Sequence, residues 1–293
     1  MLPVALIRSR TPASRRSPHA PILRLLMGGA GLTLLTACGG GAPSSSPAPE
    51  GRVYSEAQWR ALATPRPTPL EGAARVSVGR VEILAEPGWN LASADPALVV
   101  SELVATGLLA RRDVYFVERR RFAAAAERER RHLPDPAGAP PAGVSPGAEF
   151  ALQATWSEVG TGRGYLEVRL VEAADGRVVA ARRATTDPDA DAVAVARGIV
   201  REGLRALGEM GRLPAEGGQN ATAGGTAAVV RSGIPDAAVS AFARGLMAEE
   251  RWDWEAARRG YQAALGGAPS FVEARAALAR AARLRLGGTL GES

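Results

Sequence analysis

Residues 165–185 read YLEVRLVEAADGRVVAARRAT, the clearest strand-turn-strand pattern in the chain. From 166 to 170, apolar residues alternate with charged ones, which is the period of a strand that buries one face. Asp175-Gly176 follows and is a strong signal for a hairpin turn. We therefore predict two antiparallel strands, over residues 165–172 and 177–185.

Upstream of this hairpin, three further stretches have strand character. Residues 75–84 alternate valine or isoleucine with polar residues, residues 114–117 form a short apolar run, and residues 150–158 are strand-like. Between the first two, Asp95-Pro96 opens a helix, because Asp is a good N-cap and Pro suits the first helical turn.

More helices are predicted around these strands. Residues 53–63 indicate a short helix with Trp59 on its apolar side, residues 121–131 are Ala-rich on one side and Arg/Glu-rich on the other, and residues 189–210 have one apolar face. Residues 133–147 contain five prolines and must form a loop. The order β-α-β-α-β-β-β-α indicates an α/β (α+β) fold, in which helices pack on a mixed sheet.

The N-terminal residues are typical of a secretory signal peptide. Five arginines precede an uncharged apolar run, residues 25–35, that is shorter than the about 20 residues a membrane-spanning helix needs. Leu35-Thr36-Ala37-Cys38 then resembles a bacterial lipobox, which implies cleavage before Cys38 and attachment of lipid to it. Cys38 is the single cysteine, so no internal disulfide explains it; a chance cysteine after an ordinary signal peptide is the alternative.

The lipobox implies a location as well as a modification. More than one acyl chain makes a stable anchor, and the lipoprotein pattern implies three. Gly39 stands where many enteric bacteria use Asp to retain a lipoprotein at the inner membrane. We therefore expect a signal peptide over 1–37, a flexible Gly/Pro/Ser-rich tether over 38–52, and a body that faces the periplasm from the outer membrane.

The charge of the chain is concentrated in this leader. The sequence has 36 basic and 30 acidic residues, a net charge of +6, but only 31 basic residues follow Cys38, against the same 30 acids. A nucleic-acid partner is therefore not expected. The densest basic patch, residues 119–131, has interleaved glutamates and predicts a solvated helix face with salt pairs; contact with an anionic lipid surface is the alternative.

We expect no catalytic residue, no cofactor, no metal and no small-molecule substrate. His132 is the only histidine after Cys38, so the sequence lacks the residues for a histidine-based nucleophilic site or a zinc site. The glycine-rich residues 160–164 lie between two predicted strands rather than before a helix, and they indicate a hairpin instead of a phosphate cradle.

Three aspartates open a stretch that resembles the start of a calcium loop. They are Asp187, Asp189 and Asp191. Ala192 and Gly198 stand where that loop needs Gly and Glu, so the aspartates predict helix capping instead.

The C-terminal part, residues 236–286, is an Ala-rich helical region of two or three helices after a Gly/Ala/Thr-rich linker over 215–235. Its spacing resembles one tetratricopeptide repeat; a generic helical hairpin is the alternative. The matching residues are Gly245, Trp254, Ala257, Tyr261, Ala264 and Pro269.

A single such repeat cannot bury its own face. We therefore expect Trp252, Trp254 or Tyr261 to contact the sheet domain, a second copy or another protein. These three residues are the candidate protein-interaction residues.

The segment from residue 75 to about residue 214 resembles the CsgG/HfaB-type curli-assembly lipoproteins. A helix over 98–109 leads to RRDVYFVER at 111–119, close to the family's F-x-V-V-E-R strand end. GAEFALQA at 147–154 matches its G-A-D-Y-x-L-x-G strand, and LVEAADGRVV at 170–179 is close to its R-L-V-D-A-x-T-G-E-V-V.

This resemblance implies a non-enzymatic periplasmic lipoprotein that forms a homo-oligomer or contacts envelope proteins during curli-type assembly and secretion. Pore-forming members insert two hairpins with strands of about 9–11 residues, and neither 133–147 nor 160–164 offers room for them. We therefore expect no transmembrane pore of its own. A regulatory lipoprotein that docks on and activates a peptidoglycan synthase is the alternative function.

Overall fold

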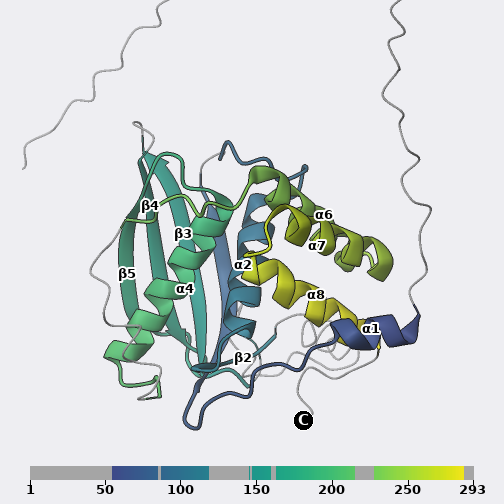
Figure 1. The fold of residues 1–293 in the computed structure, drawn as a ribbon. Coiled ribbons are helices and arrows are strands. Elements are labelled where there is room, and N and C mark those ends of the chain that lie inside the picture. The colour runs from purple at the N-terminus through teal and green to yellow at the C-terminus, as the bar shows by residue number, and fades with distance from the viewer. Residues whose placement is uncertain are drawn as a thin grey trace, which may run out of the picture. The chain divides into compact units, whose positions relative to one another are not determined.

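A computed structural model describes residues 55–84, 87–118, 145, 147–159, 163–214 and 228–286, all within one compact unit, Gly51–Ser293 (Figure 1). The predicted signal peptide and tether, Cys38 among them, lie outside the described residues. The helix predicted over 121–131 and His132 lie outside them too.

The described strands form one five-stranded mixed sheet in the order β2-β1-β3-β4-β5. β1 (Ala74–Ile83) runs parallel to β2 (Val114–Phe116) on one side and to β3 (Phe150–Val159) on the other. β3, β4 (Arg163–Glu172) and β5 (Val178–Thr186) then form an antiparallel meander. The predicted fold class, a mixed sheet with helices packed on it, is confirmed.

The β4–β5 hairpin turns where the sequence predicts it. Gly176 adopts a φ of 73°, a left-handed conformation that glycine accepts without steric cost. The Asp175 carboxylate accepts a hydrogen bond from the Arg177 backbone N–H at 2.9 Å and holds the turn. On the neighbouring pair of strands, Leu152 lies opposite Leu170, so the alternating apolar residues share one face of the sheet.

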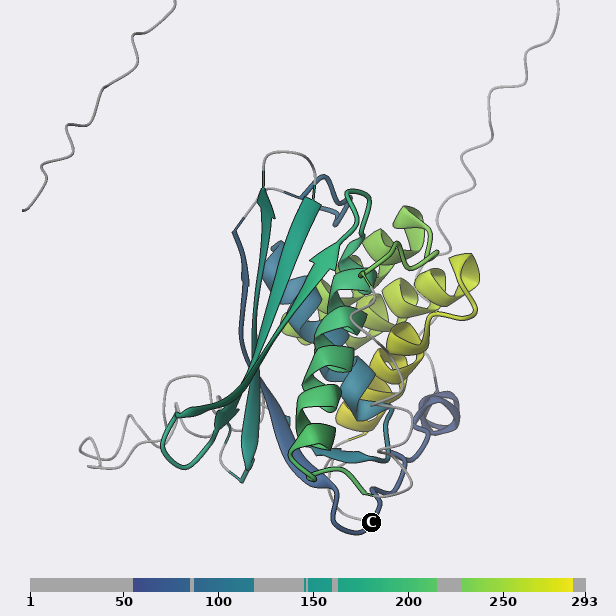
Figure 2. The same cartoon turned by 90° about the vertical axis from the view of Figure 1, so that its left-hand side faces the viewer.

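Two helices, α2 (Pro96–Leu109) and α4 (Ala192–Glu209), cover that apolar face (Figure 2). Asp95 is the N-cap of α2, as predicted. α4 begins later than the predicted residue 189, because Asp191 is its N-cap. α4 also lies close to the sheet, since a Cβ atom added at Gly203 would come within 2.5 Å of the Leu152 side chain.

The opposite face of the sheet is polar, and no helix of the described chain covers it (Figure 2). Arg169 Nε donates to Glu167 at 2.7 Å, and the same carboxylate lies 3.5 Å from Arg183 Nε. Next to them, Arg80 pairs with Glu82 at 2.8 Å. This face is open where these charges lie, but nearer β2 it is buried: Ser77, Ala151 and Val171, which lie side by side on three strands, are all almost inaccessible to solvent.

Three Ala-rich helices, α6 (Asp236–Glu250), α7 (Trp254–Gly267) and α8 (Val272–Arg285), lie on the far side of α2 and α4 from the sheet (Figure 2). The chain enters this layer through Val229, which forms an isolated parallel bridge with Thr186 at the end of β5. The layer belongs to the same hydrophobic core as the sheet domain. It is therefore packed onto that domain within the compact unit.

The short helix α1 (Glu56–Leu62) closes the described unit against this outer layer. Its Trp59 side chain is buried, and the indole N–H donates to the Glu255 carboxylate on α7 at 3.2 Å. Ser55 and Gln58 form a reciprocal capping box at its start. The segment before β1 is thus attached to the C-terminal helices.

Candidate functional site

The residues predicted to make contacts sit on a helical hairpin that is attached to the sheet domain through buried charges. Arg280 on α8 donates from Nη1 to Glu102 on α2 at 2.9 Å and from Nη2 to Glu249 on α6 at 3.0 Å. Tyr261 on α7 donates its phenolic hydrogen to Glu249 at 2.5 Å. We call these four residues the Arg280 cluster; it joins four helices.

The charges of the Arg280 cluster act strongly on one another. Burial by itself lowers the pKa of Arg280, but the carboxylates of Glu249 and Glu102 raise it, and the net pKa lies well above the ordinary value of arginine. Burial, with the charge of Glu249, also raises the pKa of Tyr261 well above its ordinary value. Arginine therefore stays charged and tyrosine stays neutral, which are the states that the hydrogen bonds require.

Small residues allow the helices of the hairpin to approach closely enough for this. A Cβ atom added at Gly260 would lie 2.5 Å from the Gly245 backbone, and one added at Gly245 would lie 2.8 Å from the Tyr261 ring. The sequence predicts a close helix contact at Gly245, and Gly245 does lie where α6 and α7 come closest together. Behind it, the ring of Phe242 lies 5.5 Å from that of Tyr261.

The structure separates the three candidate protein-interaction residues. Tyr261 is fully buried in the Arg280 cluster, and Trp254 is half-buried at the start of α7. Trp252 is 72% exposed, in the turn between α6 and α7, with a left-handed φ of 63°. Its ring meets that of Trp254 edge-on, with centroids 5.5 Å apart. Cys38, the predicted lipid-attachment residue, lies outside the described residues.

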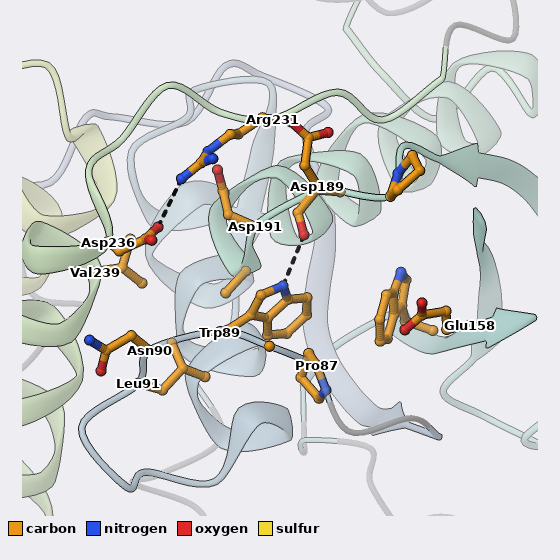
Figure 3. Close-up of a pocket in the computed structure, with 15 residues that line it drawn as sticks. Pro87, Trp89, Asn90, Leu91, Glu158, Asp189, Asp191, Arg231, Asp236 and Val239 are labelled. Atoms are coloured by element: carbon orange, nitrogen blue, oxygen red, sulfur yellow. Dashed lines mark hydrogen bonds and ion pairs between the residues drawn. The ribbon is translucent and has the colours of Figure 1, made fainter. Parts of the chain in front are cut away.

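A second feature, a pocket of about 220 Å³, opens at one end of the sheet (Figure 3). It lies beyond the ends of β1 and β3, whose connections leave toward opposite edges of the sheet, and such positions are where open α/β sheets commonly bind ligands. Figure 3 shows Trp89 in the middle of the pocket, with Glu158 to one side. The Trp89 N–H donates to the Ala190 carbonyl at 2.9 Å, which fixes the ring.

Asp191 builds the wall of this pocket. One carboxylate oxygen accepts from the Ala194 N–H at 2.8 Å and caps α4, and the other accepts from the Ser232 N–H and hydroxyl at 2.9 and 2.8 Å. It therefore holds the segment that leads to α6. At the rim, Arg231 pairs with Asp236 at 3.2 Å (Figure 3).

The lining of the pocket limits what it can hold. Ionised carboxylates accept hydrogen bonds and donate none, so Glu158, Asp189 and Asp236 suit a ligand that carries N–H or O–H groups. The pocket is smaller than the about 300–1,000 Å³ of sites for drug-sized ligands, and therefore suits a small polar group. In the part of the chain that the structure describes, no group of His, Cys, Asp and Glu is arranged to hold a metal ion.

Glu102, Glu249, Arg280 and Trp89 are not among the residues predicted from the sequence. Of these four residues, Glu102 has a recognisable signal in the sequence. Glu102 is the only charged residue in PALVVSELVATGLL, the sequence of α2, and a single carboxylate on an otherwise apolar helix needs a buried partner. Among the helices that the structure describes, none is long and apolar enough to cross a membrane.

No protein-family model and no curated protein matches the sequence. Solved structures do match: a PelC dodecamer from Paraburkholderia phytofirmans is 17% identical with a TM-score of 0.27, over 49% of this chain and 93% of that one. The hypothetical protein CT253 from Chlamydia trachomatis is 19% identical with a TM-score of 0.24, over 39% of this chain and 71% of that one. Likeness at this level carries no inference about assembly or function.

Proposed function

We propose that this protein is a non-enzymatic lipoprotein of the cell envelope that faces the periplasm from the outer membrane and acts by contacting other envelope proteins. The contact belongs to curli-type assembly and secretion, in the manner of a CsgG-like component without a pore of its own. The lipobox at Cys38 and the three CsgG-like sequence stretches support the location and the process.

One observation carries the proposal of action by contact, the exposure of Trp252. Trp252 is 72% exposed and sits on a hairpin fixed by the Arg280 cluster. Its large apolar ring is unfavourable in water and favourable when a partner protein covers it, and tryptophan is enriched at the centres of interfaces. The buried charges hold the hairpin rigid, so the contact needs little ordering when a partner arrives.

The anchor is tested by feeding cells an alkyne fatty acid. The wild-type protein should carry the label and sediment with membranes, and the Cys38→Ala variant should lose the label. Unlabelled wild-type protein in the aqueous fraction would remove the proposed location.

The contact is tested on immobilised full-length protein, with Trp252→Ser against Leu84→Ser, which removes another exposed apolar side chain, on the sheet domain. Envelope proteins kept by the wild type and by the Leu84 variant, but lost by the Trp252 variant, identify the partner. A curli-type subunit or secretion component supports the proposal; a peptidoglycan synthase would replace it with the regulatory alternative.

Oligomer formation has its own measurement. Light scattering of detergent-extracted protein should show a high-mass species. A strict monomer at all concentrations would overturn the oligomer and leave contact with other envelope proteins as the remaining mode of action.

A further inference from the structure

The hairpin that carries Trp252 also carries a groove, lined mainly by residues of α6 and α7 and also by Ala92 from the segment before α2. It has a volume of about 460 Å³, and one of its lining residues is Arg251, the residue before Trp252. Its apolar lining includes Met247, Ala256 and Ala263. Ala263 is exposed and the other two are half-buried, so this lining is open at the surface.

The lining residues repeat at helical spacing on both sides of the groove. On α6 and its C-cap they fall at 244, 247, 248 and 251, and on α7 at 256, 259, 260 and 263. Both sets follow i, i+3, i+4, i+7, the stripe that one helix presents to another. Each stripe covers two turns, about 10 Å along its helix. The groove therefore has the form of a seat for a third helix.

Three arginines border this seat, Arg244, Arg251 and Arg259. All three are exposed, and no side-chain hydrogen bond or ion pair joins them to another residue in the described ranges. The one other arginine of these two helices, Arg258, pairs with Glu255. The three charges repel one another and have no partner here.

Three nearby carboxylates already have partners, and Glu250, the residue before Arg251, is not free either. Glu249 belongs to the Arg280 cluster, Asp253 caps α7 by accepting from the Ala256 N–H at 2.9 Å, and Glu255 accepts from the Trp59 indole. The seat therefore keeps a local excess of positive charge over an apolar floor, which is complementary to a partner with acidic and small apolar residues.

The walls also decide the conformation of the occupant. An extended peptide gains affinity by bonding to a free strand edge, but the walls here are helices whose backbone groups bond within themselves. A helix satisfies its own backbone and needs only side-chain contacts. A helix therefore fits this groove better than an extended segment does.

We propose that the groove between α6 and α7 receives an acidic amphipathic helix of a partner protein. Small apolar side chains of that helix lie on Met247, Ala256 and Ala263, and its Asp and Glu side chains pair with Arg244, Arg251 and Arg259. Trp252 packs beside its end. This inference rests on the proposed function, because it names the kind of partner that the contact surface takes.

The test uses the full chain in detergent and a fluorescein-labelled synthetic helix of about 14 residues, which spans about 21 Å. The helix carries Glu on one face and Ala and Leu on the other. Fluorescence anisotropy should show saturable binding that weakens with salt. The triple variant Arg244→Glu/Arg251→Glu/Arg259→Glu should bind more than about tenfold more weakly.

Two controls separate this site from general charge attraction. The variant Arg80→Glu/Arg169→Glu/Arg183→Glu changes the net charge equally on the open face of the sheet and should bind like the wild type. A peptide of the same composition with its order scrambled to remove the apolar face should bind as weakly as the groove variant does. Equal loss in both triple variants, or equal binding of both peptides, would overturn the proposal.

Other outcomes also decide it. Absence of saturable binding of the helix overturns the proposal. Vesicles with anionic lipid that bind the wild type and not the groove variant would assign the arginines to a membrane surface instead. A concentration-dependent dimer of the free protein, lost in the groove variant, would assign the seat to a second copy. Fatty-acid labelling of Cys38 is unaffected by all of these, so failure here leaves the proposed location standing.

Discussion

Arg280 on α8 lies 2.9 Å from the carboxylate of Glu102 on α2, although 178 residues separate the two in the chain. The contact joins the helices next to the sheet with the outer helical layer. Arg280 is 3% exposed, so its charge is removed from water and compensated by Glu102 and Glu249. A buried ion pair of this kind is costly to break by removing one partner.

Replacing Arg280 by methionine is therefore expected to destabilise the protein by about 3–5 kcal/mol, because it leaves the Glu102 and Glu249 carboxylates buried without a counter-charge. Equilibrium denaturation by urea measures the change. Arg275→Met is the matched control on the same helix; Arg275 is exposed, and among the described contacts its side chain bonds only to the Pro269 carbonyl. A loss as small as that of the control would mean that the cluster is not structurally important.

The triple variant Arg280→Met/Glu102→Gln/Glu249→Gln should recover much of the lost stability. It removes the buried charges together and leaves amides that can still bond to one another and to Tyr261. If the triple variant is no more stable than Arg280→Met alone, the loss comes from packing around the guanidinium and not from unpaired charge.

Gly260→Ala is expected to lower the melting temperature. The added methyl group would lie 2.5 Å from the Gly245 backbone, so α6 and α7 must move apart, at a cost of about 1–3 kcal/mol. Gly266→Ala in the same helix meets no atom within 4 Å and should be neutral or stabilising by up to about 1 kcal/mol. Thermal unfolding followed by circular dichroism compares the two variants. A change in melting temperature of the same sign in both would contradict the close contact between α6 and α7.

Asp191→Ala should destabilise the protein by about 0.5–2 kcal/mol through the loss of the α4 cap, and further through the loss of its bonds to Ser232. Asp189 lines the same pocket but is exposed. The Asp189→Ala variant should therefore change the free energy of unfolding by no more than about 0.5 kcal/mol. Hydrogen exchange should show faster exchange at Ala194 and Ser232 in the first variant only. Uniform protection in both variants would argue against this double role of Asp191.

Stability should fall as pH rises through the folded-state pKa of Glu118. Burial raises that pKa above its ordinary value; Arg280 lowers it, and Glu102 and Glu249 raise it. The pKa of Glu118 is higher in the folded protein than in the unfolded chain, where it is about 4.3. The stability that Glu118 contributes is therefore fully present below the unfolded pKa and is lost as the pH rises through the folded pKa.

Glu118→Gln should therefore raise the melting temperature at pH 7 and change it little at pH 4. Glu158→Gln, at an exposed carboxylate of β3, is the control and should show no such contrast. If Glu118→Gln raised the melting temperature more at pH 4 than at pH 7, the pKa of Glu118 would be lowered by folding and not raised.

The sheet could be predicted because its signals are local. Alternation over 166–170, the Asp175-Gly176 turn and the Asp95 cap each depend on residues a few positions apart, and the strands and α2 lie where they indicate. The start of α4 was placed too early because three aspartates compete as caps in the sequence. Folding brings Ser232 within hydrogen-bonding distance of Asp191, and this contact favours Asp191 over the other two aspartates as the N-cap of α4.

The Arg280 cluster could not be predicted, because its members lie far apart in the chain and three of them resemble ordinary helix residues. On sequence alone Arg280 looks like its neighbours Arg283 and Arg285 in α8. The same limit applied to the three aromatic residues. Their spacing marks a helical hairpin, but whether each faces the core or solvent depends on where α8 and α2 pack, and this places Tyr261 inside and Trp252 outside.

The position of Arg280 also has a consequence for biosynthesis. A ribosome adds residue 280 long after the strands, and until α8 has left the exit tunnel Glu102 and Glu249 have no buried counter-charge. The nascent polypeptide therefore lacks this buried charge compensation during most of its synthesis.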